Sequence, residues 1–277
     1  MDDILTGSFA APRWNLWPPR TVRVVSWNID RGSRLSGIVD FLASEDADIL
    51  LLQEVDLNTR RTHHQNIAEE IARKLKMNYA FGCEFQELTQ GSRNKPAFQG
   101  QATLARWRLG STRVLRFGRQ SSFWRPRWFL PPTRPFQERL GGRIALITEI
   151  DMPGRKLASY NLHLESRGDD DVRISQLNEA LADARSYAPE VPRLLAGDLN
   201  FDVSRVLPAS ALQEMGFRSA IAIPSPHTTT PRGLFGYRRT IDWAYVSGSA
   251  DASGGLVHTD VDASDHYPIS FTLRFSG

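Results

Sequence analysis

Seven short apolar runs constrain the fold of this 277-residue chain more than any other feature of its sequence. Each run is rich in β-branched residues or alternates between apolar and polar ones, and Gly, Pro, Asp or Ser bounds it. This pattern is typical of β-strands with at least one buried face. The predicted strands span 21–27, 48–54, 143–150, 156–164, 192–198, 240–246 and 266–275.

Three segments with a helical spacing of apolar residues, 35–46, 65–77 and 169–187, lie between some of these strands. The third begins with three consecutive acids, which favour a helix N-terminus. Helices alternate with strands early and strands dominate late, so we expect mixed sheets. The economical arrangement is one α/β domain over 21–277, preceded by an N-terminal extension over 1–20. Two sheets would then pack face to face with helices outside.

The composition is that of an ordinary globular chain, with 41% apolar and 23% charged residues. No apolar run approaches the roughly 18 residues that a membrane-crossing helix needs. The start, MDDILTGSFAAPRW, is acidic and does not look like a signal peptide. Cys83 is the only cysteine, so an intrachain disulfide is impossible. We expect a cytoplasmic protein without a membrane span, and a monomer.

Arginine dominates the basic residues, with 30 of the 34, although the net charge is only +3. One interpretation is a GC-rich genome. The other is phosphate recognition, because the planar guanidinium group matches phosphate with two parallel hydrogen bonds. The bias is strongest between Arg106 and Arg143, where ten arginines accompany three tryptophans and a single acid, Glu138.

Chemically capable residues recur at or near the ends of six predicted strands. An Asn or Asp after a strand is usually a turn former, and a His among apolar residues is usually a hydrogen-bonded core residue. So many coincidences in one chain favour a site instead, because strand ends on one edge of a sheet converge. The candidate site residues are Asn28, Glu54, His163, Asp198, Asn200, Asp242, Asp265 and His266.

The acids and amides in this set favour chemistry with a hard metal ion. Glu54 and Asp265 offer oxygen ligands, which suit Mg²⁺, Mn²⁺ or Ca²⁺ better than zinc. No cysteine pair or HExxH-like spacing competes for zinc. Asp198 can accept a proton from an attacking water, and Asn200 can hold that water.

The imidazoles complete this chemistry. His163 and His266 can donate hydrogen bonds to phosphoryl oxygens, while Asp242 can orient one imidazole and keep it charged. The sequence has no GxSxG nucleophile, no Walker lysine in a glycine loop and no Rossmann glycine fingerprint. Direct attack of water on phosphorus is the simplest reaction for this set.

The ordered series WNI, QE, HLES, GDLN, IDWAYVS and SDHYP resembles the endonuclease/exonuclease/phosphatase superfamily. The resemblance runs from about Val24 to Phe275, and GDLN together with SDHYP carries most of its specificity. It implies a four-layer α-β-β-α sandwich of two mixed sheets with outer helices, and phosphoester hydrolysis with Mg²⁺ or Mn²⁺. Asn28, Glu54 and Asp265 match residues at the family's metal site.

The same resemblance assigns the catalytic roles. Asp198 and Asn200 match the pair that handles the nucleophilic water and the scissile phosphate. His266 matches the catalytic histidine, and Asp242 matches its orienting carboxylate. His163 matches the second histidine of the deoxyribonuclease-like branch.

The sequence indicates the type of reaction more clearly than it indicates the substrate. WNID, HLES and RISQL look most like the tyrosyl-DNA phosphodiesterase branch, although that branch usually carries GDTN where this chain has GDLN. Nucleic acid is therefore the first candidate substrate, and a small-molecule or lipid phosphoester is the alternative. A non-catalytic binding module on the same fold is a third hypothesis, which the complete set of site residues disfavours.

Residues 121–143, which we call the arginine–tryptophan segment, offer two interpretations. As a substrate flap, Arg125 and Arg127 would bind phosphates and Trp124 would stack on a base. As a surface loop, the aromatic residues would only pin the segment to the sandwich. A second long loop, 224–239, indicates a binding or disordered role, and His227 within it is expected to be a surface residue.

Overall fold

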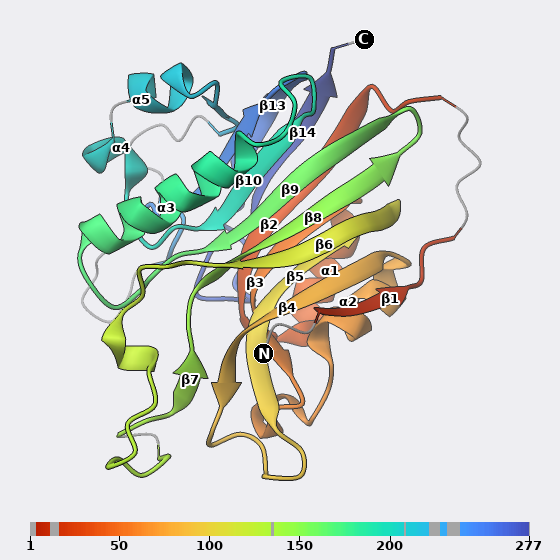
Figure 1. Ribbon diagram of the computed structural model, residues 1–277. Helices are drawn as coiled ribbons and strands as arrows, with labels where there is room; N and C mark the ends of the chain where they lie inside the picture. Colours follow the sequence, from red (N-terminus) through yellow and green to blue (C-terminus); the bar gives the residue numbers. More distant parts are fainter. Residues whose placement is uncertain are drawn as a thin grey trace.

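The computed structural model describes residues 4–11, 17–133, 136–207, 209–221, 228–231 and 239–276. Within them, two sheets pack face to face and helices cover the outer faces, which makes four layers (Figure 1). No helix in these residues is long and apolar enough to cross a membrane. The helices are α1 (Leu35–Ser44), α2 (Ile67–Leu75), α3 (Asp170–Ala184), α4 (Val203–Val206) and α5 (Ala209–Glu214).

Both sheets are mixed, as expected. Parallel pairing joins β2 (Thr21–Arg31) to β3 (Ile49–Leu57) in the first sheet, and β9 (Arg155–His163) to β10 (Arg193–Asp198) in the second. The first sheet has the order β1 (Ile4–Ser8), β4 (Asn78–Glu87), β5 (Ala97–Ala105), β3, β2, β14 (Ile269–Phe275), β13 (Ala250–Val257), with β7 (Arg139–Gly141) on β4. The second has the order β11 (Arg218–Ser219), β12 (Asp242–Ser247), β10, β9, β8 (Ile144–Met152), β6 (Arg108–Arg116).

The seven predicted strands and three predicted helices are all present, with ends shifted by up to four residues. In the described residues, seven further strands were missed, among them β4 and β5. Their inward positions carry polar residues, such as Glu84, Gln99 and Gln101, which interrupt the apolar pattern that identifies a strand. The segment expected to be an N-terminal extension contains β1, which pairs with β4 over Ile4–Ser8. That part of 1–20 is therefore an edge strand of the sheet.

The space between the sheets changes from apolar to polar toward one end of the sandwich. Because side chains alternate between the two faces of a strand, every second residue points into this space. These positions run Val22, Val24, Ser26, Asn28 on β2, Leu157, Ser159, Asn161, His163 on β9, and Leu194, Ala196, Asp198 on β10. The polar ends of the three strands coincide, and the candidate site lies there.

A buried amide pair ties the sheets together just behind the site. Nε2 of Gln53 on β3 donates a 2.7 Å hydrogen bond to Oδ1 of Asn161 on β9. Nδ2 of Asn161 is within 3.0 Å of the carbonyl oxygens of Leu52 and Ala102 in the opposite sheet. A satisfied polar contact of this kind fixes the relative position of the two sheets. The site residues that the two sheets contribute are thereby held in register.

Candidate active site

Three site residues are lateral neighbours on adjacent strands of the second sheet. Asp198 ends β10, opposite His163 of β9 on one side and Asp242 of β12 on the other. All three are buried. Since paired positions share one face of a sheet, their side chains project together into the space between the sheets.

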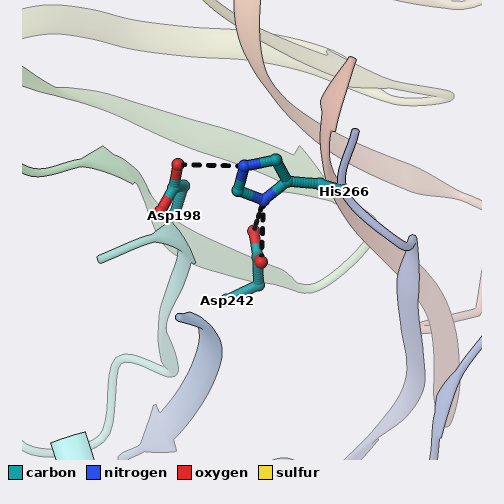
Figure 2. A group of neighbouring side chains, drawn as sticks. All are labelled: Asp198, Asp242 and His266. Carbon is teal, nitrogen blue, oxygen red and sulfur yellow. Dashed lines mark hydrogen bonds and ion pairs between the residues drawn. The ribbon is translucent and has the colours of Figure 1, made fainter. Parts of the chain in front are cut away.

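His266 lies three residues before β14 of the first sheet, and its ring faces Asp198 and Asp242 (Figure 2). Its Nδ1 lies 2.9 Å from Oδ2 of Asp242, and its Nε2 lies 3.7 Å from Oδ2 of Asp198. The buried indole of Trp27 donates a 2.8 Å hydrogen bond to the carbonyl oxygen of His266. Burial alone would lower the pKa of His266, but the carboxylates of Asp242 and Asp198 raise it to about 10. The imidazole is therefore held in its charged form beside Asp198.

A second acid–imidazole pair lies on the other side of Asp198. Nε2 of His163 is 3.7 Å from Oδ2 of Asp198, and its Nδ1 is 3.1 Å from Oε2 of Glu84 on β4. Nη1 of Arg143 lies 3.3 Å from the same Glu84 oxygen and 2.8 Å from Nδ1 of His163. Asp198 thus lies between two imidazoles, each with Nε2 toward it and Nδ1 toward a buried acid.

Glu84 and Arg143 were not among the predicted site residues. Glu84 lies in NYAFGCEFQE, which was not predicted to be a strand, and Arg143 begins a strand that was assigned no role. One signal was available, because Glu84 stands alone in a largely apolar run. A carboxylate buried there needs a cationic or hydrogen-bonding partner from elsewhere in the fold.

Single replacements of Glu84 and Arg143 should lower the free energy of unfolding by amounts whose sum exceeds the loss in the double variant. Glu84→Gln or Arg143→Met leaves a buried charge without its partner, which typically costs about 3–5 kcal/mol. In Glu84→Gln/Arg143→Met neither charge remains, so we expect a cost clearly below the sum of the two single costs. Urea unfolding of the four proteins measures this coupling. Additive costs would show that the two charges do not interact.

Glu54 reaches the site because β3 carries a β-bulge. The pairing of β3 with β5 shifts between Leu52 and Val55, and Glu54 has a φ of 50°. Strict alternation would place Glu54 on the face opposite to that of Gln53, toward the outer helices. The bulge redirects its carboxylate between the sheets, where Oε1 lies 4.0 Å from Nε2 of His163.

Positive charge surrounds Glu54. Its Oε2 lies 3.9 Å from Nε of Arg31 and accepts a 3.3 Å hydrogen bond from Gln99. Burial alone would raise the pKa of Glu54, but the positive charges of His163, Arg31 and Arg143 lower it to about 2. The carboxylate is therefore ionised at neutral pH and suited to bind a cation.

Asp30 and Asp265 lie near Glu54. Asp30 lies within a second bulge, in β2 between Asn28 and Arg31, and has a φ of 41°. Burial and the negative charges of Asp265 and Glu54 raise the pKa of Asp30, so the three carboxylates interact electrostatically. Their donor atoms do not all lie within 4.8 Å of one another, although hard oxygen donors of this kind suit a divalent cation such as Mg²⁺. Asp30 was missed by the sequence prediction, although it follows Asn28 by two residues in WNID.

Two asparagines orient the Asp198 carboxylate. Nδ2 of Asn28 donates to Oδ2 of Asp198 at 3.2 Å, while its Oδ1 accepts a 3.1 Å hydrogen bond from the Asp30 N–H. The backbone N–H of Asn200 donates to Oδ1 of Asp198 at 2.9 Å, and its Nδ2 donates to the Leu164 carbonyl at 3.0 Å. Since both Asn28 amide atoms have hydrogen-bond partners, metal ligation by Asn28 stays a prediction.

Asp198, Asp242 and His266 could themselves hold a metal ion, because one donor atom of each lies within 4.8 Å of the others. However, the Asp242 carboxylate and Nδ1 of His266 already share hydrogen bonds of 2.9 and 3.1 Å. A charged imidazole also cannot donate a lone pair to a metal. Glu54 and Asp265 therefore stay the predicted ligands, although Asp198, Asp242 and His266 are the only group in the described residues whose donor atoms lie this close together.

The structure overturns the predicted stacking role of Trp124. Its ring is only 5% exposed and packs against Phe85 at a centroid distance of 4.7 Å. Its Nε1 lies 3.0 Å from both carboxylate oxygens of Glu165. A ring enclosed in this way has no free face for a base, so Trp124 anchors the segment. Arg125 is exposed and Arg127 is partly exposed, and their substrate-binding role stays a prediction.

Much of the apparent excess of positive charge between Arg106 and Arg143 is neutralised by acids from other parts of the chain. Five of the ten arginines form ion pairs with carboxylates that lie outside this stretch of sequence. The pairs are Arg106 with Asp46 and Asp48, Arg108 with Asp151, Arg113 with Asp183, Arg139 with Glu87, and Arg143 with Glu84. The local count of one acid therefore overstated the positive charge available to a substrate.

The second long loop, 224–239, falls mostly outside the described residues, and so does His227. Thr229, one of the described residues of this loop, supports the site. Its Oγ1 accepts hydrogen bonds from the backbone N–H groups of Ile241 and Asp242, at 3.0 and 3.1 Å. Thr229 therefore helps to fix the start of β12, where Asp242 lies.

Residues 25–266 match the sequence model of the Endonuclease/Exonuclease/phosphatase family. A search of the curated proteins gave no match. Among solved structures, an endonuclease/exonuclease/phosphatase from Beutenbergia cavernae is similar, with 20% identity and a TM-score of 0.66. That similarity covers 94% of this chain and 72% of the other.

Two further solved structures share this fold. TDP2 from Caenorhabditis elegans is 20% identical, with a TM-score of 0.63, over 92% of this chain and 74% of the other. ANGEL2, described as a 2',3'-cyclic phosphatase, is 16% identical, with a TM-score of 0.63, over 92% of this chain and 96% of the other.

Proposed function

This chain belongs to the endonuclease/exonuclease/phosphatase family, and on that premise we propose that it hydrolyses phosphodiesters by direct attack of water. One observation carries the proposal. Asp198 lies 3.7 Å from Nε2 of both His163 and His266, next to the group of carboxylates around Glu54. This places a proton acceptor, two imidazole hydrogen-bond donors and a candidate cation site together.

Each group then has a defined task. Asp198, oriented by Asn28 and by the N–H of Asn200, accepts the proton of the attacking water. The Nε2–H groups of His163 and His266 donate hydrogen bonds to phosphoryl oxygens, where negative charge develops in the transition state. Because these donors are buried and already oriented, they cost little reorganisation during the reaction.

The carboxylates of Glu54 and Asp265 would hold a divalent cation, Mg²⁺ or Mn²⁺, with Asn28 and Asp30 beside them. Such an ion offsets the charge of the phosphate and polarises its oxygens, which contributes several kcal/mol. The chain places hard oxygen donors and no thiolate at this position, as these metals prefer.

We further propose nucleic acid as the substrate. The guanidinium groups of Arg125 and Arg127 remain without acidic partners among the described residues. One protein of the same fold, ANGEL2, is described in complex with adenosine-2',3'-vanadate, which supports a nucleotide phosphoester. A small or lipid phosphodiester is the second candidate, and the neutralisation of five of the ten arginines between Arg106 and Arg143 favours it, since fewer cations are left for a polyanion.

A substrate panel with Mg²⁺ or Mn²⁺ tests the proposal. It contains single- and double-stranded DNA, RNA, a 5′-tyrosyl oligonucleotide, phosphoinositide, sphingomyelin and bis-p-nitrophenyl phosphate. We expect hydrolysis of the generic diester and faster hydrolysis of at least one nucleic acid, with both lost in His266→Ala. Preference for a lipid would replace the nucleic-acid proposal, and inactivity on the whole panel would contradict the phosphodiesterase proposal.

A further inference from the structure

Exposed apolar side chains are concentrated in the arginine–tryptophan segment. Seven large apolar side chains are exposed in the described part of the chain, and four of them lie in this segment: Phe123, Trp128, Phe129 and Phe136. Two of the four begin the run WFLPP over 128–132, which contains no charged side chain and which we call the apolar tip. Trp128 at its start is 94% exposed. Adjacent apolar side chains left in water indicate an interaction surface, because their exposure is unfavourable.

A braced loop holds the apolar tip away from the sheets. Nε2 of Gln137 donates to the carbonyl of Arg125 at 2.6 Å, and its Oε1 accepts from the N–H of Arg127 at 3.1 Å. At the base of the loop, the buried Trp124 indole is 3.0 Å from the Glu165 carboxylate. The tip therefore projects beyond the sheets on a loop that its own hydrogen bonds hold in place (Figure 1).

The backbone of the apolar tip offers few free hydrogen-bond donors. Pro131 and Pro132 have no N–H group, and the N–H of Leu130 donates to the carbonyl of Arg127 at 2.9 Å. The next N–H, that of Thr133, donates to the carbonyl of Pro131 at 2.8 Å. Donors that are absent or already paired lower the cost of moving a loop from water into an apolar phase. Nucleic acid and protein partners supply hydrogen-bonding groups of their own, whereas the interior of a bilayer does not.

Cations lie behind the apolar tip. Arg127 directly precedes it, and the hairpin between β4 and β5 adds the exposed Arg93 and Lys95. This hairpin is joined to the segment by the pairing of β4 with β7, and it extends toward the same end of the sandwich (Figure 1). Neither 118–137 nor 88–96 contains an acid. An apolar projection with basic residues behind it complements a membrane surface with anionic headgroups.

We propose that the apolar tip inserts into the surface of a bilayer that contains anionic lipids and docks the enzyme there. This docking goes beyond the proposed function and holds for either candidate substrate. A single strand of nucleic acid would stack on the aromatic rings but not on Leu130, Pro131 or Pro132. A bilayer accommodates the whole run, and tryptophan is enriched at its interface with water.

Co-sedimentation with vesicles of phosphatidylcholine and phosphatidylserine, in EDTA to prevent turnover, tests the proposal. Trp128→Ala/Phe129→Ala should weaken binding about 100-fold or more, because each ring that becomes buried contributes about 10-fold or more to the affinity. Trp17→Ala/Leu256→Ala is the matched control, since it removes two exposed apolar side chains outside the segment. The control should bind as the wild type does.

Two further measurements separate insertion from adsorption by charge. Lipids with brominated acyl chains should quench tryptophan fluorescence in the wild type, and Trp128→Phe should still bind but lose this quenching. Arg93→Ala/Lys95→Ala should weaken binding to the anionic vesicles about 25-fold, because each cation near such a surface contributes about 5-fold. On vesicles of phosphatidylcholine alone, this variant and the wild type should bind equally.

Four outcomes would overturn the proposal. The first is a wild type that does not bind the anionic vesicles, and the second is equal binding by Trp128→Ala/Phe129→Ala. The third is a loss of single-stranded oligonucleotide binding, but not of vesicle binding, in that variant, which would assign the tip to nucleic acid. The fourth is dimerisation of the wild type without vesicle binding, abolished in the same variant, which would assign the tip to a second copy of this chain.

The Tm and the hydrolysis of bis-p-nitrophenyl phosphate should equal those of the wild type in Trp128→Ala/Phe129→Ala, because both side chains are exposed. A lower Tm together with weaker vesicle binding would make the tip structural and contradict the proposal. Failure of the proposed function is distinguishable, because vesicle binding is measured without turnover.

Discussion

Asp198→Asn and His266→Ala are each expected to lower kcat by about 100-fold or more, because general acid–base groups contribute about 10²–10⁴-fold. Asn keeps the shape of Asp198 but cannot accept the proton of the attacking water. His266→Ala removes a charged donor that faces Asp198 at 3.7 Å. Since both act on one transition state, the double variant should lose less than the product of the two single losses. Steady-state kinetics on bis-p-nitrophenyl phosphate measures all three.

Two controls separate chemistry from folding. Asp202→Asn replaces a neighbouring acid that caps α4, and Asn caps a helix as well as Asp, so its kcat should be unchanged. His266→Ala leaves Asp242 buried without its partner, so His266→Gln, which keeps a hydrogen-bond donor, is the second variant at that position. Turnover close to wild type in Asp198→Asn, on every substrate the enzyme accepts, would show that Asp198 is not the proton acceptor.

Removal of divalent cations is expected to abolish turnover, and Mg²⁺ or Mn²⁺ should restore it. The physical reason is that Glu54, Asp30 and Asp265 add negative charge to a site that must accept a phosphate. A second readout needs no turnover: a bound ion raises the Tm, by an amount that corresponds to about 2.7 kcal/mol at a hundredfold excess over Kd. Glu54→Ala should abolish both the reactivation and the Tm shift.

Glu214→Ala is the matched control for Glu54→Ala, since Glu214 is an exposed acid at the end of α5. It should respond to Mg²⁺ as the wild type does. Activity that survives EDTA and is unchanged in Glu54→Ala would contradict the metal assignment. A Tm shift that persists in Glu54→Ala but disappears in Asp242→Ala would indicate that the ion binds to the group of Asp198, Asp242 and His266.

The sequence was sufficient to predict strands whose inward-facing residues are apolar. It was insufficient to predict strands whose inward-facing residues are polar. Val22 and Val24 lie in an apolar pattern that continues to Asn28, so both the strand and its polar end could be recognised. β4 and β5 could not be recognised because Glu84, Gln99 and Gln101 are polar residues at buried positions. They interrupt the alternation of apolar and polar residues that predicts a strand. Their partners come from other strands, so nothing near them in sequence explains their burial.

The sequence by itself determined the types and the order of the site residues, because the alternation of a strand and the polar residue at its end are local features. Only the tertiary structure decided their environment. The bulge in β3 turns Glu54 inward, and Glu84 meets His163 across 79 residues of chain. Trp124 is enclosed for a similar reason, since its partners Phe85 and Glu165 come from distant parts of the chain. Burial and charge pairing depend on which segments the packed sheets bring together, and local sequence does not encode them.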